Sequence, residues 1–154
     1  MPFQLPNYAD AAFPAQASPD AGDFAIMAAG TGQTGVVTGC AGSVTGANMV
    51  VTIAAGRITV NGTEVAVASG DLTIGTANAT NPRIDLLVVS SAGTKSVQAG
   101  TAAANPVYPA IPSNSVVLYA VYVPANDTSI QSNQLVDKRV FVVNVEDAMA
   151  YLYF

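Results

Sequence analysis

The chain has 154 residues, enough for one domain that buries roughly two-thirds of its unfolded surface. Charged residues make up only 10% of it, against about 25% in a typical soluble domain, and the net charge is −5. Its five cationic residues are scattered, which argues against binding to a nucleic-acid backbone, and the absence of histidine removes the commonest general base and metal ligand.

Residues 1–34 are predicted to form an extended, proline-rich arm. The dense prolines of its first 23 residues exclude both a helix and the interior of a sheet. Between them stand the isolated aromatic residues Phe3, Tyr8 and Phe13, which we expect to anchor the arm on its own domain or on a neighbouring subunit. A frayed chain end is the alternative. No cationic region precedes the first apolar residues, so we expect no secretory signal.

The stretch from residue 24 to residue 56 carries no charge and is long enough to span a bilayer. Repeated Gly, Thr and Ser residues interrupt it, however, together with Gln33 and Asn48. We therefore expect strands and turns in this stretch and no membrane partner.

The clearest local signal lies in residues 57–67. Two short runs of alternating apolar and polar residues flank Asn61-Gly62, a pair that favours a two-residue type I′ hairpin turn. Closing the hairpin on this turn places Ile58 opposite Val65, so that the apolar side chains share one face. The sequence thus predicts an antiparallel hairpin with a fixed register.

Residues 82–89 predict the central strand of the fold. The run begins at Pro82 and continues almost without polar residues, which is typical of a strand that is covered on both faces. Arg83 and Asp85 lie two positions apart and therefore on the same face. In a chain with so few charges this spacing suggests a fixed ion pair. The alternative is that both residues merely solvate the end of the strand.

The second half of the chain continues the pattern of strands and turns. Three prolines between residues 99 and 115 predict an extended connection that lies across an apolar surface, anchored by Val107, Tyr108 and Ile111. Residues 116–123 predict a second strongly apolar strand, beside the central strand or at a subunit interface. We expect a further strand over residues 134–143.

Residues 144–154 predict one short C-terminal helix, with an extended segment as the alternative. The segment closes with Tyr151, Leu152, Tyr153 and Phe154, which would form an interface if they are exposed.

Short strands at regular spacing, separated by Gly, Asn and Pro, predict an all-β protein. We expect an antiparallel β-sandwich or partly closed barrel over residues 35–143. The extended arm, residues 1–34, would precede it, and the short segment 144–154 would follow it.

Catalytic and metal-binding patterns are not found. Without histidine, a serine or cysteine nucleophile lacks its usual base. The acidic residues are dispersed, and Asp10, Asp20 and Asp23 lack the spacing of a calcium loop. Cys40, the single cysteine, is expected to be a small buried hydrophobic residue. We expect no catalytic, metal-binding or cofactor-binding residues, and no enzyme.

Several motifs, taken in their order along the chain, resemble a known family. They are residues 51–57 (VTIAAGR), 60–62 (VNG), 79–86 (ATNPRIDL), 100–106 (GTAAANP), 109–112 (PAIP), 118–124 (LYAVYVP) and 137–139 (DKR). The series covers about residues 35–141 and resembles the β-rich structural module of tailed-bacteriophage virion proteins, of the minor tail, baseplate upper and fibre-attachment type. The resemblance implies a β-sandwich-like module, commonly trimeric, with a structural role in a virion.

In such modules the Pro-Arg-Ile-Asp stretch would be an interior strand, so Arg83 and Asp85 would be structural residues. Because charges are scarce in this chain, we expect Arg83 to pair with Asp137, or Asp85 with Arg139.

The leading interpretation is a non-enzymatic virion protein that forms a homotrimer and docks on other virion proteins as a tail, baseplate or fibre-attachment component. Such relatives typically carry a receptor-binding portion after the module, whereas this chain ends soon after Arg139. We therefore expect a small accessory protein, either an adaptor in the tail tip or, as the alternative, a capsid decoration protein that attaches as a trimer through its N-terminal arm. A weaker alternative is a glycan-binding module that would use Tyr108, Tyr119 or Tyr122, although core packing is the expected role of these tyrosines.

Overall fold

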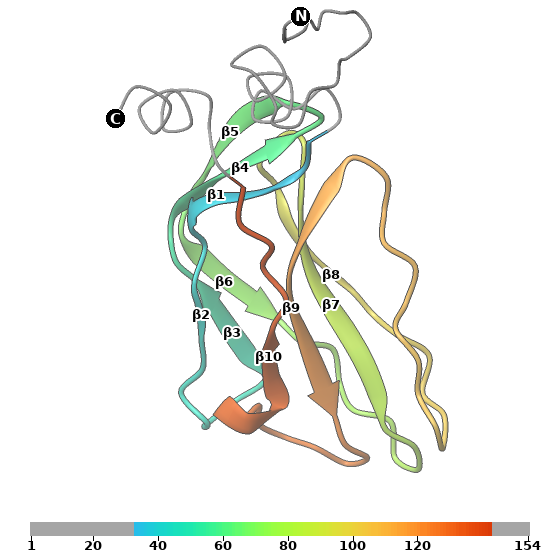
Figure 1. Cartoon of the computed structure of the whole chain (residues 1–154). Helices are drawn as coiled ribbons and strands as arrows, with labels where there is room; N and C mark the ends of the chain where they lie inside the picture. Colours follow the sequence, from blue (N-terminus) through green and yellow to red (C-terminus); the bar gives the residue numbers. More distant parts are fainter. Residues whose placement is uncertain (1–32, 143–154) are drawn as a thin grey trace, which may run out of the picture. The chain divides into compact units, whose positions relative to one another are not determined.

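Strands supply almost all the regular structure of residues 33–142, the part of the chain that the computed structural model describes (Figure 1). The predicted arm, apart from its last two residues, and the predicted C-terminal helix lie outside these residues. The same holds for the interface candidates Phe3, Tyr8, Phe13, Tyr151, Leu152, Tyr153 and Phe154. Within residues 33–142 the prediction of an all-β fold is confirmed.

The described strands form three antiparallel sheets. The first has the order β1 (Gly35–Gly39), β4 (Gly56–Val60) and β5 (Thr63–Val67). The second has the order β2 (Gly42–Ser43), β3 (Val50–Ile53) and β6 (Gly70–Thr73). The third has the order β10 (Leu135–Asp137), β9 (Ser115–Val123), β7 (Arg83–Ser90) and β8 (Lys95–Gln98), and a short 3-10 helix, η1 (Ser132–Gln134), precedes β10. The arrangement is sandwich-like, and none of these described sheets closes into a barrel.

The main hydrophobic core lies between the four-stranded sheet and the two three-stranded sheets (Figure 1). Ile53 comes from β3 and Ile58 from β4, while Leu87 and Val121 come from β7 and β9, and all four side chains are fully buried. Burial of an aliphatic side chain of this size contributes about 1.5–3 kcal/mol. One core thus holds the three sheets together.

The hairpin of β4 and β5 has the predicted turn and register. Asn61 and Gly62 both adopt positive φ, at 52° and 84°, as a type I′ turn requires. Ile58 faces Val65 across the two strands. The prediction from the turn pair is therefore confirmed.

β9 pairs with β7 along the whole length of β7, so the two apolar strands are neighbours as predicted. The register shifts between Leu87, which faces Tyr119, and Val88, which faces Val117, and Leu118 is therefore an extra residue on β9. Such a β-bulge interrupts the alternation of side chains along a strand. Leu118 and Tyr119 consequently both belong to the main core although they are consecutive.

The opposite face of the four-stranded sheet is apolar as well. Ile84, Leu86 and Val88 of β7 and Val117 and Ala120 of β9 form a second hydrophobic cluster, separate from the main core. We call this side of the sheet the outer face. Both faces of the central strand are thus apolar, as its sequence predicted.

Residues 99–114 form the expected extended connection and contain no strand. Val107, Tyr108 and Ile111 remain 72%, 54% and 58% exposed, so these side chains anchor the connection less than we expected. The backbone holds it as well, because the Ala103 N–H donates to the Pro82 carbonyl oxygen over 2.9 Å.

The strand expected over residues 134–143 is shorter than predicted. β10 pairs with β9 only as far as Asp137. The Lys138 N–H still donates to the Leu118 carbonyl oxygen over 2.9 Å, and the chain then leaves the four-stranded sheet. The Val36 N–H donates to the Val140 carbonyl oxygen over 2.8 Å, and the Val142 N–H donates to the Val36 carbonyl oxygen over 2.9 Å. The crossing segment, residues 138–142, therefore runs parallel to β1, fills the free edge of that strand, and bridges two sheets along one side.

Candidate functional site

Arg83 and Asp85 form the ion pair that their spacing suggested. Arg83 Nε lies 2.8 Å from Asp85 Oδ1, and the two side chains are 9% and 0% exposed. The other guanidinium nitrogens donate to the carbonyl oxygens of Gly75 and Thr76 over 2.7 and 2.8 Å. Asp85 Oδ1 also accepts a hydrogen bond from the Gly100 N–H over 2.9 Å. The pair thus fastens the segment before β7 and the segment after β8 to the same strand.

Asp85 Oδ2 is buried and has no hydrogen-bond partner among the described residues. A buried carboxylate that lacks a full set of partners is stable only while its cation stays beside it. The two residues are therefore interdependent, and their role is structural.

The pairing that we expected between strands is wrong. Arg83 does not pair with Asp137, and Asp85 does not pair with Arg139, because each charged residue pairs with the one two positions away on its own segment.

The sheet register explains why these pairs stay apart. β9 lies between β7 and β10, so the outer two strands are about 10 Å apart. Arg83 faces Val123 of β9, whereas Asp137 faces Tyr119. These positions differ by a further displacement of roughly 13 Å along the strand.

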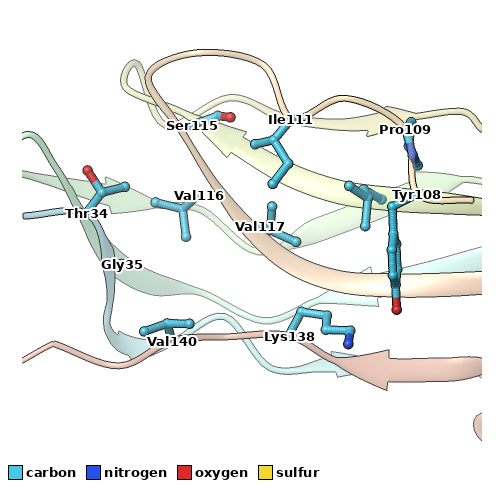
Figure 2. Close-up of a pocket in the computed structure, with 11 residues that line it drawn as sticks. Thr34, Gly35, Tyr108, Pro109, Ile111, Ser115, Val116, Val117, Lys138 and Val140 are labelled. Atoms are coloured by element: carbon cyan, nitrogen blue, oxygen red, sulfur yellow. The ribbon is translucent and has the colours of Figure 1, made fainter.

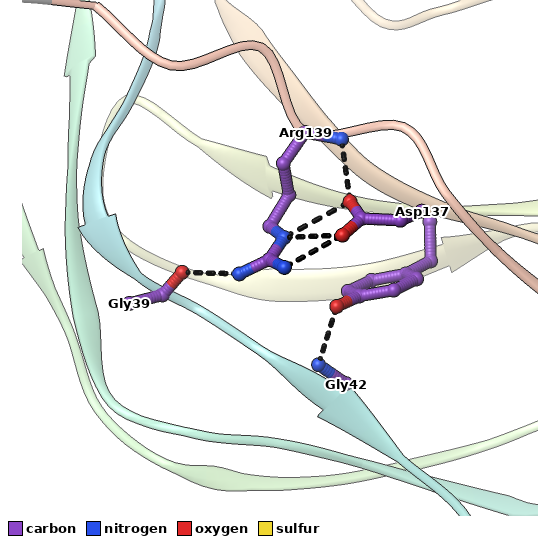
Figure 3. Close-up of polar contacts among 5 residues, drawn as sticks. Gly39, Gly42, Asp137 and Arg139 are labelled. Atoms are coloured by element: carbon purple, nitrogen blue, oxygen red, sulfur yellow. Dashed lines mark hydrogen bonds and ion pairs between the residues drawn. The ribbon is translucent and has the colours of Figure 1, made fainter.

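Arg139 pairs with Asp137 and also connects the crossing segment to β1 by a hydrogen bond (Figure 3). Its Nε and Nη2 donate to the Asp137 carboxylate over 2.6–3.2 Å. Its Nη1 donates to the Gly39 carbonyl oxygen over 2.9 Å. The guanidinium also lies 5.4 Å from the ring centroid of Tyr119 and 5.1 Å from that of Phe141. All three nitrogens of this guanidinium are therefore used to hold the fold.

Hydrogen bonding, charge and burial change the pKa of three neighbouring groups, Asp137, Arg139 and Cys40. Hydrogen bonding from Arg139 lowers the pKa of Asp137 below its ordinary value of 3.8, and the same bond raises the pKa of Arg139. Burial raises the pKa of the Cys40 thiol, which outweighs the opposite effect of the Arg139 charge. Cys40 is fully buried, as predicted.

A groove of about 470 Å³ opens on the outer face of the four-stranded sheet (Figure 2). The apolar residues of its lining include Leu86, Tyr108, Pro109, Ile111, Val117 and Val140. The connection forms one side of the groove and the crossing segment the other, with β9 between them (Figure 2). Lys138 is the one charged residue in the lining, and its Nζ lies 5.4 Å from the ring centroid of Tyr108.

The three tyrosines considered for glycan binding differ in their surroundings. Tyr119 is buried, and its hydroxyl accepts a hydrogen bond from the Gly42 N–H over 2.8 Å (the dashed line at Gly42 in Figure 3). Core packing is therefore confirmed for Tyr119. The same expectation is wrong for Tyr108 and Tyr122, which are 54% and 43% exposed. Tyr108 lines the groove, and Tyr122 faces Ile84 on the outer side of the sheet.

The acidic residues of residues 33–142 do not cluster. No three Cys, Asp or Glu side chains of this part of the chain gather closely enough to hold a metal ion. No helix within it is long and apolar enough to cross a membrane.

Sequence reasoning did not find the groove. Lys138 and Val140 come close to Val117 only because the chain leaves one sheet for another after β10, and no local pattern indicates that crossing. The one local signal is the apolar content of the connection, with Tyr108 and Ile111 between prolines. No protein-family model, curated protein or solved structure matches the chain.

Proposed function

We propose that this chain is a non-enzymatic structural protein of a tailed-phage virion. It assembles with copies of itself as a homotrimer, and it docks on neighbouring virion proteins as a tail, baseplate or fibre-attachment component. The observation that carries the proposal is the outer face of the four-stranded sheet, which is apolar and carries an open apolar groove. The ordered series of motifs, from residue 51 to residue 139, supports the assignment to a phage virion.

The side chains around the groove favour association. Tyr108, Ile111 and Val140 line it and are each more than half exposed. Exposed apolar side chains that gather around a groove often mark a site where a ligand or another protein binds. Covering apolar surface contributes about 25 cal/mol per Å², so a partner that covers roughly 100 Å² of apolar surface here would gain about 2–3 kcal/mol.

The charged residues of residues 33–142 support a structural role. Six of them form three ion pairs within the fold. Arg57 pairs with Glu64 across the hairpin of β4 and β5, Arg83 pairs with Asp85 on β7, and Arg139 of the crossing segment pairs with Asp137 of β10. A general acid or base needs a pKa near the working pH, whereas Arg139 moves the pKa of Asp137 further away from neutrality.

Sedimentation equilibrium of the full chain tests the self-assembly. We expect a species of three times the 15.6 kDa chain mass at micromolar concentration. A monomer over the whole concentration range would contradict the proposal.

The copy number per purified virion, measured by quantitative mass spectrometry against the major capsid protein, tests the location. A small multiple of three or six copies would agree with a tail or baseplate component. A copy number near that of the capsid protein would instead favour the alternative, a capsid decoration protein. Absence from the particle would overturn the virion proposal.

A glycan-binding module is the second candidate, and the exposure of Tyr108 and Tyr122 favours it. An aromatic ring of this kind presents an apolar surface to a ligand and a polar hydroxyl to water. Binding of the full chain to a glycan array, abolished by Tyr108→Ala, would support this candidate. Failure to bind any glycan would exclude it.

A further inference from the structure

The groove on the outer face is selective in the chemistry that it can accept. Most of its lining is apolar, and the side-chain hydroxyls of Thr34, Ser115 and Tyr108 are among its few polar groups. A ligand backbone with many N–H groups would lose hydrogen bonds to water there, at a cost of about 1–3 kcal/mol for each group left unpaired. The groove therefore favours an extended segment in which prolines replace some of these donors and in which the side chains are apolar.

Proline-containing segments meet this requirement. Proline has no N–H, and its ring holds the chain in an extended conformation before it binds. Grooves lined by aromatic residues recognise such segments in other proteins. Tyr108 and Pro109 supply an aromatic and a proline surface on the wall that the connection forms (Figure 2).

Lys138 places a positive charge in the groove, and this charge favours a negatively charged ligand. It is the one charged residue of the lining, and no carboxylate among residues 33–142 pairs with it. Its Nζ lies beside the Tyr108 ring, on the side of the groove that the crossing segment forms. The segment that fits should therefore be acidic as well as apolar.

We infer that the groove accepts the segment from Pro6 to Pro14 of a second copy of this chain, with its two prolines, Tyr8 and Phe13 in the apolar part and Asp10 against Lys138. The first 23 residues contain prolines and spaced aromatic residues, and they carry acidic residues but no lysine or arginine. This inference rests on the proposed function, because it assigns the contact through which copies hold one another.

The chain is long enough for this exchange between copies. The roughly 20 residues from Phe13 to Gln33 span up to about 65 Å when extended. A domain of roughly 110 residues has a radius of gyration of about 13 Å, so this span exceeds its diameter.

Photo-crosslinking of the full chain tests the location of the contact. The photoreactive residue p-benzoylphenylalanine replaces Ile111, which is exposed at the groove, in an equimolar mixture of ¹⁵N-labelled and unlabelled protein. We expect crosslinks to peptides from residues 1–23, with pairs of mixed isotope. The same probe at Ser69, an exposed residue outside the groove lining, should give none to these peptides.

Crosslinks from position 111 that reach only residues 33–142, or that join only peptides of one isotope, would overturn the inference. If the protein still sediments as a trimer in that case, the proposed function stands without this contact. If the protein is monomeric throughout, both fail.

A charge exchange tests the role of Lys138. Lys138→Glu and Asp10→Lys should each weaken self-association by about fivefold, the upper range for an exposed ion pair. The double variant should recover most of this loss. Lys138→Glu combined with Asp20→Lys makes the same change in net charge and should not recover it. Equal behaviour of the two double variants would overturn the assignment of Asp10.

Discussion

The hydroxyl of Tyr119 accepts a hydrogen bond from the Gly42 N–H over 2.8 Å, and this bond joins two sheets that face each other across the core. A Cβ on Gly42 would lie only 2.8 Å from the tyrosine ring, so glycine is required at this position. The contact depends on the β-bulge, because the extra residue on β9 turns Tyr119 inward.

Tyr119→Phe should lower the free energy of unfolding by about 1–3 kcal/mol, because it leaves the Gly42 N–H without its partner. Urea denaturation of the full chain measures this. Tyr122→Phe is the matched control, since Tyr122 is partly exposed on the outer side of the sheet, and it should change stability by less than about 0.5 kcal/mol. Equal losses from the two variants would contradict the role given to the Tyr119 hydroxyl.

Arg83→Ala should destabilise the protein by about 3–5 kcal/mol, because it leaves the buried Asp85 carboxylate without a cation. Thermal and urea unfolding measure the loss. Arg57→Ala removes an ion pair that is exposed on the hairpin, and it should cost no more than about 1 kcal/mol. An unchanged melting temperature for Arg83→Ala would show that the buried pair does not hold the loops around β7.

The Asp137–Arg139 pair should make stability depend on pH in acid. The pKa of Asp137 is lowered in the folded protein from its ordinary value of 3.8, so its contribution is fully present above that value and is lost as the pH falls through the lower, folded pKa. The stabilities of the wild type and of Asp137→Asn should therefore differ most at pH 5–6, and the difference should shrink as the pH falls below about 4. A difference that stays constant over this range would contradict the assignment.

Ile111→Asp should weaken self-association without unfolding the protein, because Ile111 is exposed and lies on the wall of the groove. A charge there must be desolvated when a partner covers the groove. Analytical ultracentrifugation measures the association, and circular dichroism checks that the strands remain. Ser69→Asp serves as the control outside the groove lining, and a trimer that tolerates both changes equally would place the interface elsewhere.

The sequence predicts the parts of the fold that short-range chemistry determines. Asn61-Gly62 specifies its own turn and hence the register of β4 with β5. The apolar run from Arg83 specifies a strand with both faces covered. Arg83 and Asp85 are close enough in the chain to find each other.

What sequence reasoning missed depends on contacts between distant segments. Leu118 lies in a continuous apolar run, and no glycine or polar residue marks it as a bulge. The partner of Arg139 could not be inferred from charge alone, because the displacement between β7 and β10 is a property of the assembled sheet. The groove likewise exists only once the crossing segment has reached β1.

The parallel pairing of β1 with the crossing segment also determines how the domain would carry a mechanical load. The described chain begins just before β1 and ends at Val142, so a pull between its two ends would slide these parallel segments past each other. The two hydrogen bonds of Val36, to Val140 and from Val142, would then be loaded together rather than opened one after the other. In single-molecule stretching of the full chain, Val142→Pro removes one of these donors and should lower the rupture force, whereas an unchanged force would place the resisting contact elsewhere. A domain that is held at both ends in a larger assembly would thus resist a pulling force through the shear strength of this pairing.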